Sequence, residues 1–283
     1  MKRYRVFSLD LDSRPFFLSV DIQESWEENV KSLHRENKER LTQELLAEFG
    51  TLSAGRKKQD FEDLGSLPIS ILAFHNKFLH QIRTAFVMGS YYPALTASCT
   101  LGERILNHLI LLLREDFSGT PEYKGVFNKD SFDNWSLPIE VLEAWKVLLP
   151  KASESFRKLW KVRKEAVHFK PEIDENDRAL ALKAIHLLYE IVGEQFSGFG
   201  PQPWFITGIP GECYLKSEVE SQPFIKKVYC PKCFLVGPYH KIEYRNNQFI
   251  IYDISEYENR NITDEEFVTL RKQGLEKQRQ QNT

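Results

Sequence analysis

The stretch FRKLWKVRKEAVHFK, residues 156–170, decides the fold class. Plotted as a helix at about 100° per residue, it has one broad apolar face made of Phe156, Leu159, Trp160, Val162, Ala166 and Val167. Arg163 lies near the middle of this face. A buried guanidinium without a partner is very costly. The stretch is therefore predicted to be an amphipathic helix of a larger helical core, in which a neighbouring helix supplies a partner for Arg163.

Helical spacing continues on both sides of this stretch. Apolar residues recur at helical intervals in residues 21–49, 68–88, 93–115, 138–149, 151–169 and 174–196. Pro68, Pro93 and Pro138 each stand where a first helical turn tolerates proline, and Gly50 ends the first helix. Residues 51–65 are polar and irregular, which predicts a loop. Together these patterns predict a mainly α protein built on an up-and-down helical bundle.

The character of the sequence changes after Gly198, where glycine and proline crowd together. Short β-rich runs follow at residues 204–207, 212–215, 224–229, 242–245 and 249–254. Asn246 and Asn247 indicate a hairpin turn between the last two runs, and residues 263–266 form a capping box for a last helix. Residues 2–12 alternate like a strand that this unit could recruit. The expected division is 1–66 (strand, long helix and loop), 67–198 (helical bundle) and 199–283 (small antiparallel β-rich unit), α+β overall.

The bulk composition bounds the class of protein. Of the 283 residues, 42% are apolar and 28% charged, which is typical of a globular chain. A formal charge of -2 gives no overall attraction to nucleic acid or to an anionic membrane, so such binding requires a local patch. The longest apolar stretch, residues 109–113, is far too short to span a bilayer. With no secretory signal visible and only four cysteines, we expect a cytoplasmic protein that does not associate with membranes.

The side of the 156–170 helix opposite its apolar face is basic. It carries Arg157, Lys161, Lys164 and His168 at spacings of four, three and four residues. Positive charge concentrated on one helix of an acidic chain predicts binding of a polyanion. In the helix 93–115, Glu103 and Asn107 lie one turn apart within a polar strip. A Glu103–Arg163 pair would satisfy both charges, and on physical grounds alone an internal ion pair is preferred to a catalytic role.

One cysteine pair has the spacing of a metal knuckle. Cys230 and Cys233 are separated by two residues in the sequence CPKC, but one such pair is only half a zinc site. Cys213 and His240 could complete a structural site of three sulfurs and one nitrogen. Two thiols without metal are the favoured interpretation, and the structural zinc is the alternative.

The motif RKEAVH, residues 163–168, fits the Arg-x(4–6)-His pattern of the HEPN superfamily, and the helix YPALTASCTLGERILNH, residues 92–108, resembles the second core helix of that family. The resemblance covers residues 68–196. It implies a bundle of four to five helices, usually dimeric, in which two motifs meet in one cleft. Many members are metal-independent ribonucleases in toxin, phage-defence or RNA-processing systems, and others are inactive binding modules.

The resemblance implies roles for individual residues. Arg163 and His168 would be catalytic: His168 would transfer the proton and Arg163 would stabilise the charged phosphorane. Glu103 and Asn107 would support Arg163, no cofactor would be required for catalysis, and the partners would be RNA, a second copy of the chain and an antitoxin or regulatory protein. Lys164 follows the arginine where RNA-cleaving members often have Asn, Asp or His. Two hypotheses therefore remain: a dimeric HEPN-type endoribonuclease, or a non-catalytic module that binds RNA or protein.

Overall fold

The structure is a computed structural model that describes residues 1–7, 12–167, 171–246 and 248–281, with the backbone alone described at 167, 171–175 and 281. The chain divides into two compact units. Residues 1–9 and 197–283 form the β-containing unit, and residues 10–196 form the helical unit. This division differs from the three expected segments. The N-terminal strand belongs with the C-terminal residues, and residues 10–66 belong with the helical bundle.

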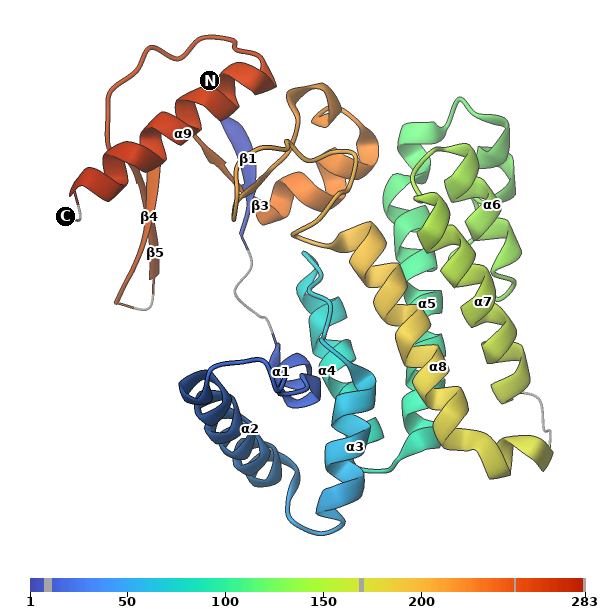
Figure 1. Cartoon of the computed structure of the whole chain (residues 1–283). Coiled ribbons are helices and arrows are strands. Elements are labelled where there is room, and N and C mark those ends of the chain that lie inside the picture. The colour runs from blue at the N-terminus through green and yellow to red at the C-terminus, as the bar shows by residue number, and fades with distance from the viewer. Residues whose placement is uncertain (8–11, 168–170, 247, 282–283) are drawn as a thin grey trace. The chain divides into compact units, whose positions relative to one another are not determined.

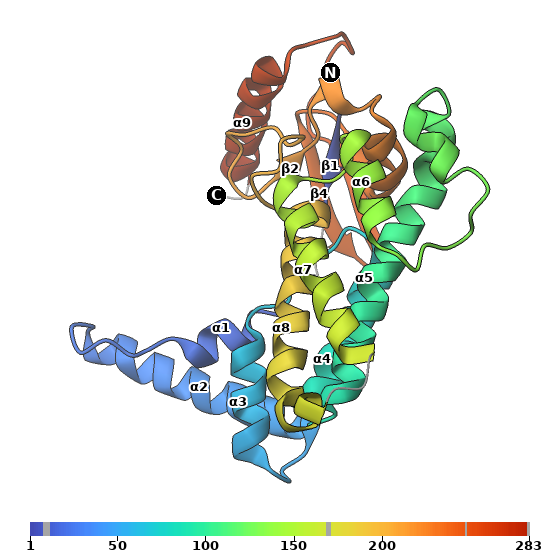
Figure 2. The same ribbon diagram turned by 90° about the vertical axis from the view of Figure 1, so that its right-hand side faces the viewer.

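The helical unit is built on an up-and-down bundle, so the expected fold class is confirmed (Figure 1). Its helices are α4 (Ala73–Val87), α5 (Tyr91–Leu113), α7 (Pro150–Val167) and α8 (Pro171–Phe196), with the short α6 (Ser136–Ala144) packed on α5 and α7. Figure 2 shows α5, α7 and α8 running side by side. The apolar face expected from residues 156–170 is the buried face of α7, where the side chains of Phe156 and Leu159 have no solvent exposure.

Three further helices precede the bundle: α1 (Arg14–Ser19), α2 (Glu28–Phe49) and α3 (Ala54–Leu64). The prediction of a loop at residues 51–65 is wrong, because α3 occupies most of it. The buried positions of α3 are Lys57, Asp60, Phe61 and Leu64. They have the spacing of a helix face, but two of them are charged, so the apolar periodicity that marks a buried helix is absent from the sequence.

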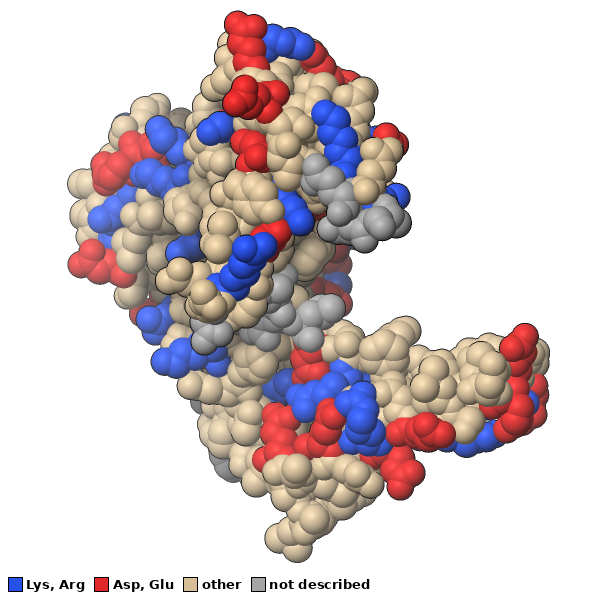
Figure 3. Space-filling view, turned by 90° about the vertical axis from the view of Figure 1, so that its left-hand side faces the viewer, with Lys and Arg blue, Asp and Glu red and all other residues tan. Residues whose placement is uncertain are grey.

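Helix α2 extends from the bundle as an arm. Its C-terminal half is anchored by the buried side chains of Leu41, Leu45 and Phe49. Toward its N-terminus the side chain of Leu33 is 65% exposed, and on α1 that of Phe16 is 57% exposed. Figure 3 shows uncharged surface along one side of this arm and charged side chains gathered along the other side and at the tip. The arm is therefore amphipathic, and the described residues do not cover its apolar side.

The β-containing unit has the N-terminal strand at its centre. Strand β1 (Arg3–Val6) lies between β2 (Cys213–Tyr214) and β3 (Cys233–Val236) and is antiparallel to both. Strands β4 (His240–Arg245) and β5 (Gln248–Asp253) form a separate antiparallel hairpin. The recruitment of the N-terminal strand and the hairpin at residues 242–254 are confirmed.

One strand prediction in this unit is wrong, and one strand was not predicted. Residues 224–229 were expected to be extended, but Ile225–Tyr229 forms a helical segment, which brings Val228 and Tyr229 into the core. The strand β3 was not expected at all. A run of apolar residues this short does not distinguish a strand from a buried helical turn, so packing against the rest of the unit decides.

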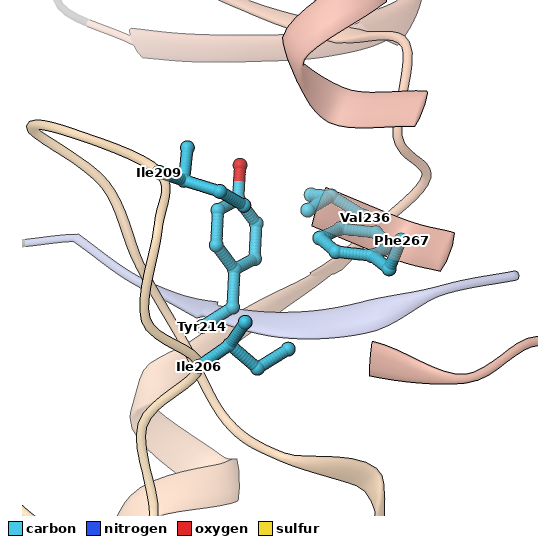
Figure 4. Packing of buried hydrophobic residues seen from close by; sticks show 5 residues of the cluster. All are labelled: Ile206, Ile209, Tyr214, Val236 and Phe267. Carbon is cyan, nitrogen blue, oxygen red and sulfur yellow. The ribbon is translucent and has the colours of Figure 1, made fainter. Parts of the chain in front are cut away.

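Helix α9 (Asp264–Gln281) covers the sheet and closes the core of the β-containing unit. Figure 4 shows this core, in which five side chains converge from loops, strands and helix: Ile206, Ile209, Tyr214, Val236 and Phe267. Among the residues that the structure describes, none of the helices combines the length and the apolar composition needed to cross a membrane.

Candidate functional site

The site is centred on Arg163 of α7, which pairs with Glu103 of α5 as expected from the sequence. Nη2 of Arg163 lies 2.9 Å from Oε2 of Glu103. The indole Nε1 of Trp135 donates a hydrogen bond to the same oxygen over 3.2 Å, and the guanidinium carbon of Arg163 lies 6.0 Å from the centre of the indole ring. Glu103 is thus held by two donors, and Arg163 by a carboxylate and an aromatic ring.

A close approach of α5 and α7 makes this pairing possible. Gly102 precedes Glu103, and a Cβ atom at Gly102 would lie 2.8 Å from Cδ2 of Leu159 and 2.8 Å from Cη2 of Trp135. Only hydrogen fits there, so the backbone of α5 can contact the side chains of Leu159 on α7 and of Trp135, which directly precedes α6. The next residue along α5 then reaches Arg163.

The pair lies at the edge of the core. The side chain of Arg163 is 26% exposed and that of Glu103 24% exposed, whereas Trp135 beneath them is fully buried. Water reaches one side of the guanidinium, so Arg163 has N–H groups directed away from Glu103 that a ligand could use. This geometry is compatible with an internal ion pair, and also with an arginine that is held in one orientation to bind an anion.

Two other polar side chains lie along the same face of α5. Oδ1 of Asn107 is buried and has no hydrogen-bond partner among the described residues. One turn before Glu103, burial raises the pKa of the Cys99 thiol to about 12, although the charge of Arg163 opposes the shift. Cys99 is therefore a neutral thiol at physiological pH and lacks the thiolate that a nucleophile needs.

His168, the proposed proton-transfer residue, lies outside the described residues. The last described residue of α7 is Val167. The distance and relative direction of Arg163 and His168 are accordingly not part of the site that the structure describes, and the catalytic pairing of the two remains a prediction from the sequence.

The basic side of α7 is partly neutralised by neighbouring acids. Nη2 of Arg157 lies 2.6 Å from Oε2 of Glu143, and Nζ of Lys158 lies 2.8 Å from Oε1 of Glu154. Lys161 is exposed. Of the three residues expected to bind RNA, Arg157 therefore has its charge largely compensated, while Lys161 and Lys164 contribute most of the positive potential on this surface.

Lys164 also has an aromatic neighbour. Its ammonium nitrogen lies 4.1 Å from the ring centre of Trp160, one turn earlier on α7, which is a close cation–π contact. The half-buried indole holds the lysine near the helix surface. A phosphate could bind the ammonium group, and a base could stack on the indole if the lysine moved aside.

The four residues of the alternative zinc site are not brought together. Cys213 and Cys233 both pair with Val6, from opposite sides of β1, so two strand spacings, about 10 Å, separate their backbones. His240 lies elsewhere: its Nδ1 donates to the carbonyl of Gly237 over 2.7 Å, and its Nε2 lies 2.5 Å from Nη1 of Arg5. Within the described ranges no group of three or more His, Cys, Asp or Glu side chains is arranged to hold a metal ion.

The protonation states of the cysteines and of His240 agree with this arrangement of the side chains. Burial raises the pKa of the Cys233 thiol to about 12, and the nearby Cys230 adds to the shift. Burial and the charge of Arg271 lower the pKa of His240 to about 3. The cysteines are neutral thiols, and His240 is a neutral imidazole inside a polar network with Arg5.

A charged cluster that sequence reasoning missed lies in the helical unit. Asp60 of α3 is fully buried, and its carboxylate accepts hydrogen bonds from Nη1 of Arg56 (2.6 Å), from the hydroxyl of Tyr91 (2.9 Å) and from Nε of Arg178 (2.9 Å). Arg178 also binds Asp63. The cluster joins α3 to α5 and α8 and balances its own charges, so it is a structural element. The only signal in the sequence was the mixture of charges at helical spacing in residues 56–63.

In comparisons with known proteins, no family model, no curated protein and no solved structure matches the chain. The HEPN resemblance of residues 68–196 therefore remains a prediction from the sequence motif and its helical setting.

Proposed function

We propose that this protein is a metal-independent endoribonuclease of HEPN type that acts as a homodimer, in a toxin, phage-defence or RNA-processing system. The supporting observation is the arrangement of Arg163, which Glu103 and Trp135 hold in one direction at the edge of the core. A fixed and partly exposed guanidinium is suited to bind the non-bridging oxygens of a phosphate. Lys161 and Lys164 on the same helix supply positive charge for the neighbouring phosphates.

The proposed reaction uses the 2′-hydroxyl of the RNA as its nucleophile. His168 removes the proton from that hydroxyl, whose oxygen attacks the adjacent phosphorus. The bond from phosphorus to the 5′-oxygen breaks, and the products are a 2′,3′-cyclic phosphate and a 5′-hydroxyl. Arg163 stabilises the charge that develops on the phosphorane oxygens. DNA lacks the 2′-hydroxyl, so it should bind without being cut.

The test is incubation of the purified protein with mixed RNA, with and without EDTA. Wild-type protein is expected to release cyclic phosphate ends in both buffers. His168→Ala should lower the rate by roughly 10²-fold or more, while His80→Ala, a change at an exposed histidine of α4, serves as the control and should retain the wild-type rate. RNA left intact by wild-type protein in both buffers would contradict the proposal.

A Glu103→Gln variant separates positioning from binding. The amide keeps the shape of the side chain and an acceptor for Trp135, but it removes the charge that holds Arg163. We expect the cleavage rate to fall while the affinity for RNA is unchanged, because Lys161 and Lys164 remain. Equal losses of rate and affinity would indicate a general effect on the fold, which the melting temperature would also report.

The second candidate function is a non-catalytic module that binds RNA or protein. It is favoured by the same ion pair, since Glu103 already compensates the charge of Arg163, and by the pairing of Arg157 with Glu143. The oligomeric state also distinguishes the two candidate functions, because the enzyme is expected to act as a homodimer. Light scattering that gave a monomer at high micromolar concentration would count against the shared active site.

A further inference from the structure

The helical unit has two apolar surfaces that its other described residues leave open. The first lies on the arm, where Val30 and Leu33 of α2 are one turn apart and are 36% and 65% exposed. Leu33, Glu36 and Phe17 of α1 line a groove of about 430 Å³ along this side of the helix. These four residues are called the arm stripe below.

The second surface is a groove of about 440 Å³ between α4 and α5. Phe78 and Ile82 line its α4 wall, and along α5 its lining runs from Pro93 through Ala97 to Arg104. The guanidinium carbon of Arg104 lies 5.3 Å from the ring centre of Phe78, which holds this side chain at the end of the groove. This surface is called the α4–α5 groove below.

The hydroxyl groups in the α4–α5 groove have partners within their own helix. Thr96 donates to the carbonyl of Tyr92 over 3.0 Å, and Thr100 donates to the carbonyl of Thr96 over 2.9 Å. An apolar side chain laid over them would therefore leave neither hydroxyl donor without an acceptor. Grooves of this kind, formed by two helices, bind the apolar face of an amphipathic helix.

The charges of the two surfaces are complementary. Glu36 accepts a hydrogen bond from the hydroxyl of Ser32 over 3.1 Å and has no basic partner in the part of the chain that the structure describes. Helix α4 contains no Asp or Glu, and Glu103, the one acid of α5, is paired with Arg163. Arg104 is accordingly left with no carboxylate partner among the described side chains. Each surface therefore carries an unpaired charge, and the two charges are opposite in sign.

The arm of the same chain points away from this groove. Its C-terminal half is anchored by the buried side chains of Leu41, Leu45 and Phe49, and α2 packs on α1 and α3. Figure 2 shows the N-terminal half of α2, which carries the arm stripe, extending away from α4 and α5. An arm that reaches the groove must therefore come from another molecule.

We propose that the arm stripe of one copy of this chain binds the α4–α5 groove of a second copy, with Glu36 of the arm paired to Arg104 of the groove. The contact buries Val30 and Leu33, which are exposed in the single chain, and gives both unpaired charges a partner. In a twofold-symmetric dimer it forms twice, once at each groove.

The position of Arg104 at the end of the groove fixes the direction of the arm. With Glu36 over Arg104, Leu33 and Val30 lie inside the groove only if α2 runs parallel to α5. At 1.5 Å per residue, Leu33 lies about 4.5 Å before Glu36 along its helix, and Thr100 lies about 6 Å before Arg104. The side chain of Leu33 is therefore placed beside that of Thr100.

This inference rests on the proposed function only for the homodimer, to which it adds the surface that joins the copies. Cross-linking tests it without measuring cleavage. Full-length Leu33→Cys, labelled with nitrogen-15, is mixed with unlabelled Thr100→Cys under a mild oxidant, and peptide mass spectrometry identifies the disulfides. A bridge between position 33 of a labelled chain and position 100 of an unlabelled chain is expected.

Two controls accompany the cross-linking. Leu52→Cys replaces a leucine that is 83% exposed in the turn after α2, outside the arm stripe, and its mixture with Thr100→Cys should give no bridge. Each variant oxidised alone, with its native cysteines, sets the background.

A charge exchange tests the ion pair. Glu36→Arg and Arg104→Glu should each weaken dimerisation by about 10-fold or more, because like charges then face each other, whereas the double variant should recover most of the loss. Glu140→Arg is the matched control, since it makes the same charge change at an exposed residue of α6 and should dimerise as wild type. Sedimentation measures the dimer, and melting temperatures verify the fold.

The outcomes separate this inference from the nuclease. A dimer without the bridge between positions 33 and 100, or a double variant as weak as the single ones, would overturn the inference and leave the nuclease to its RNA assay. A bridged dimer that leaves RNA intact would support the inference and contradict the nuclease. A chain that stays monomeric at high micromolar concentration, or whose groove binds only a purified partner protein, would overturn the inference.

Discussion

Replacement of Asp60 by asparagine is expected to destabilise the helical unit strongly. Asp60 has no exposed surface, and three donors from α3, α5 and α8 converge on its carboxylate. Asparagine has nearly the same volume, so the change creates no cavity. It removes the negative charge and turns one acceptor oxygen into an NH2 group that faces N–H or O–H donors.

The magnitude follows from the burial of the three charged groups. Removing one member of a buried ion pair costs about 3–5 kcal/mol, because the remaining charge stays without its partner. The side chains of Arg56 and Arg178 are each 37% exposed, and Arg178 keeps Asp63 as a partner. Both arginines can thus recover some hydration, which sets the expected loss at the lower end, about 3 kcal/mol. For a unit of this size, the loss corresponds to a fall in melting temperature of about 6–12 °C.

The assay is thermal unfolding followed by far-ultraviolet circular dichroism, with Asp63→Asn as the matched control. Asp63 is the other acid that binds Arg178, but its side chain is 29% exposed. Its loss is expected to cost about 1 kcal/mol or less. If Asp60→Asn melts within 2–4 °C of the wild type, a shift of about 1 kcal/mol, the reasoning that this cluster ties the three helices together is refuted.

Three further predictions concern packing, pH and RNA binding. Gly102→Ala should lower the free energy of unfolding by about 1–3 kcal/mol, because the new methyl group would lie 2.8 Å from neighbouring side chains. Gly55→Ala in α3 has open space around the new methyl group and should raise the free energy of unfolding by up to about 1 kcal/mol. Urea unfolding in which both variants shift the same way would contradict this. Burial lowers the pKa of His75 to about 3. The contribution of His75 to stability should therefore be complete above about pH 6.5 and fall by about 1.4 kcal/mol per pH unit as the pH drops from about 6.5 toward 3. The stability of His75→Leu should depend less on pH in that window, and parallel stability curves for variant and wild type would contradict this. Lys161→Ala and Lys164→Ala should each reduce the salt slope of RNA binding by about 0.7–0.9, while Arg157→Ala should reduce it less, because Arg157 is already paired with Glu143. A larger effect at Arg157 than at either lysine would contradict this.

Local sequence patterns were enough to predict the main helices and the contact at the centre of the candidate site. α5, α7 and α8 have apolar residues at helical spacing over several turns, and that periodicity requires no knowledge of the partner helices. The Glu103–Arg163 pair was predictable because an arginine in the middle of an apolar face needs an acceptor, and the neighbouring helix offered one carboxylate at the right depth.

Elsewhere only the tertiary structure decided the outcome. α3 has charged residues at its buried positions, so no local pattern distinguishes it from a loop; Asp60 can be buried there because Arg56, Tyr91 and Arg178 reach it from positions up to 118 residues away. His240 likewise has a neighbour from the far end of the sequence, Arg5, and does not complete a zinc site with the cysteines. Apolar periodicity is a local property that the sequence displays directly, but a buried polar group is stable only where its hydrogen-bond partners are, and the fold alone brings those partners together.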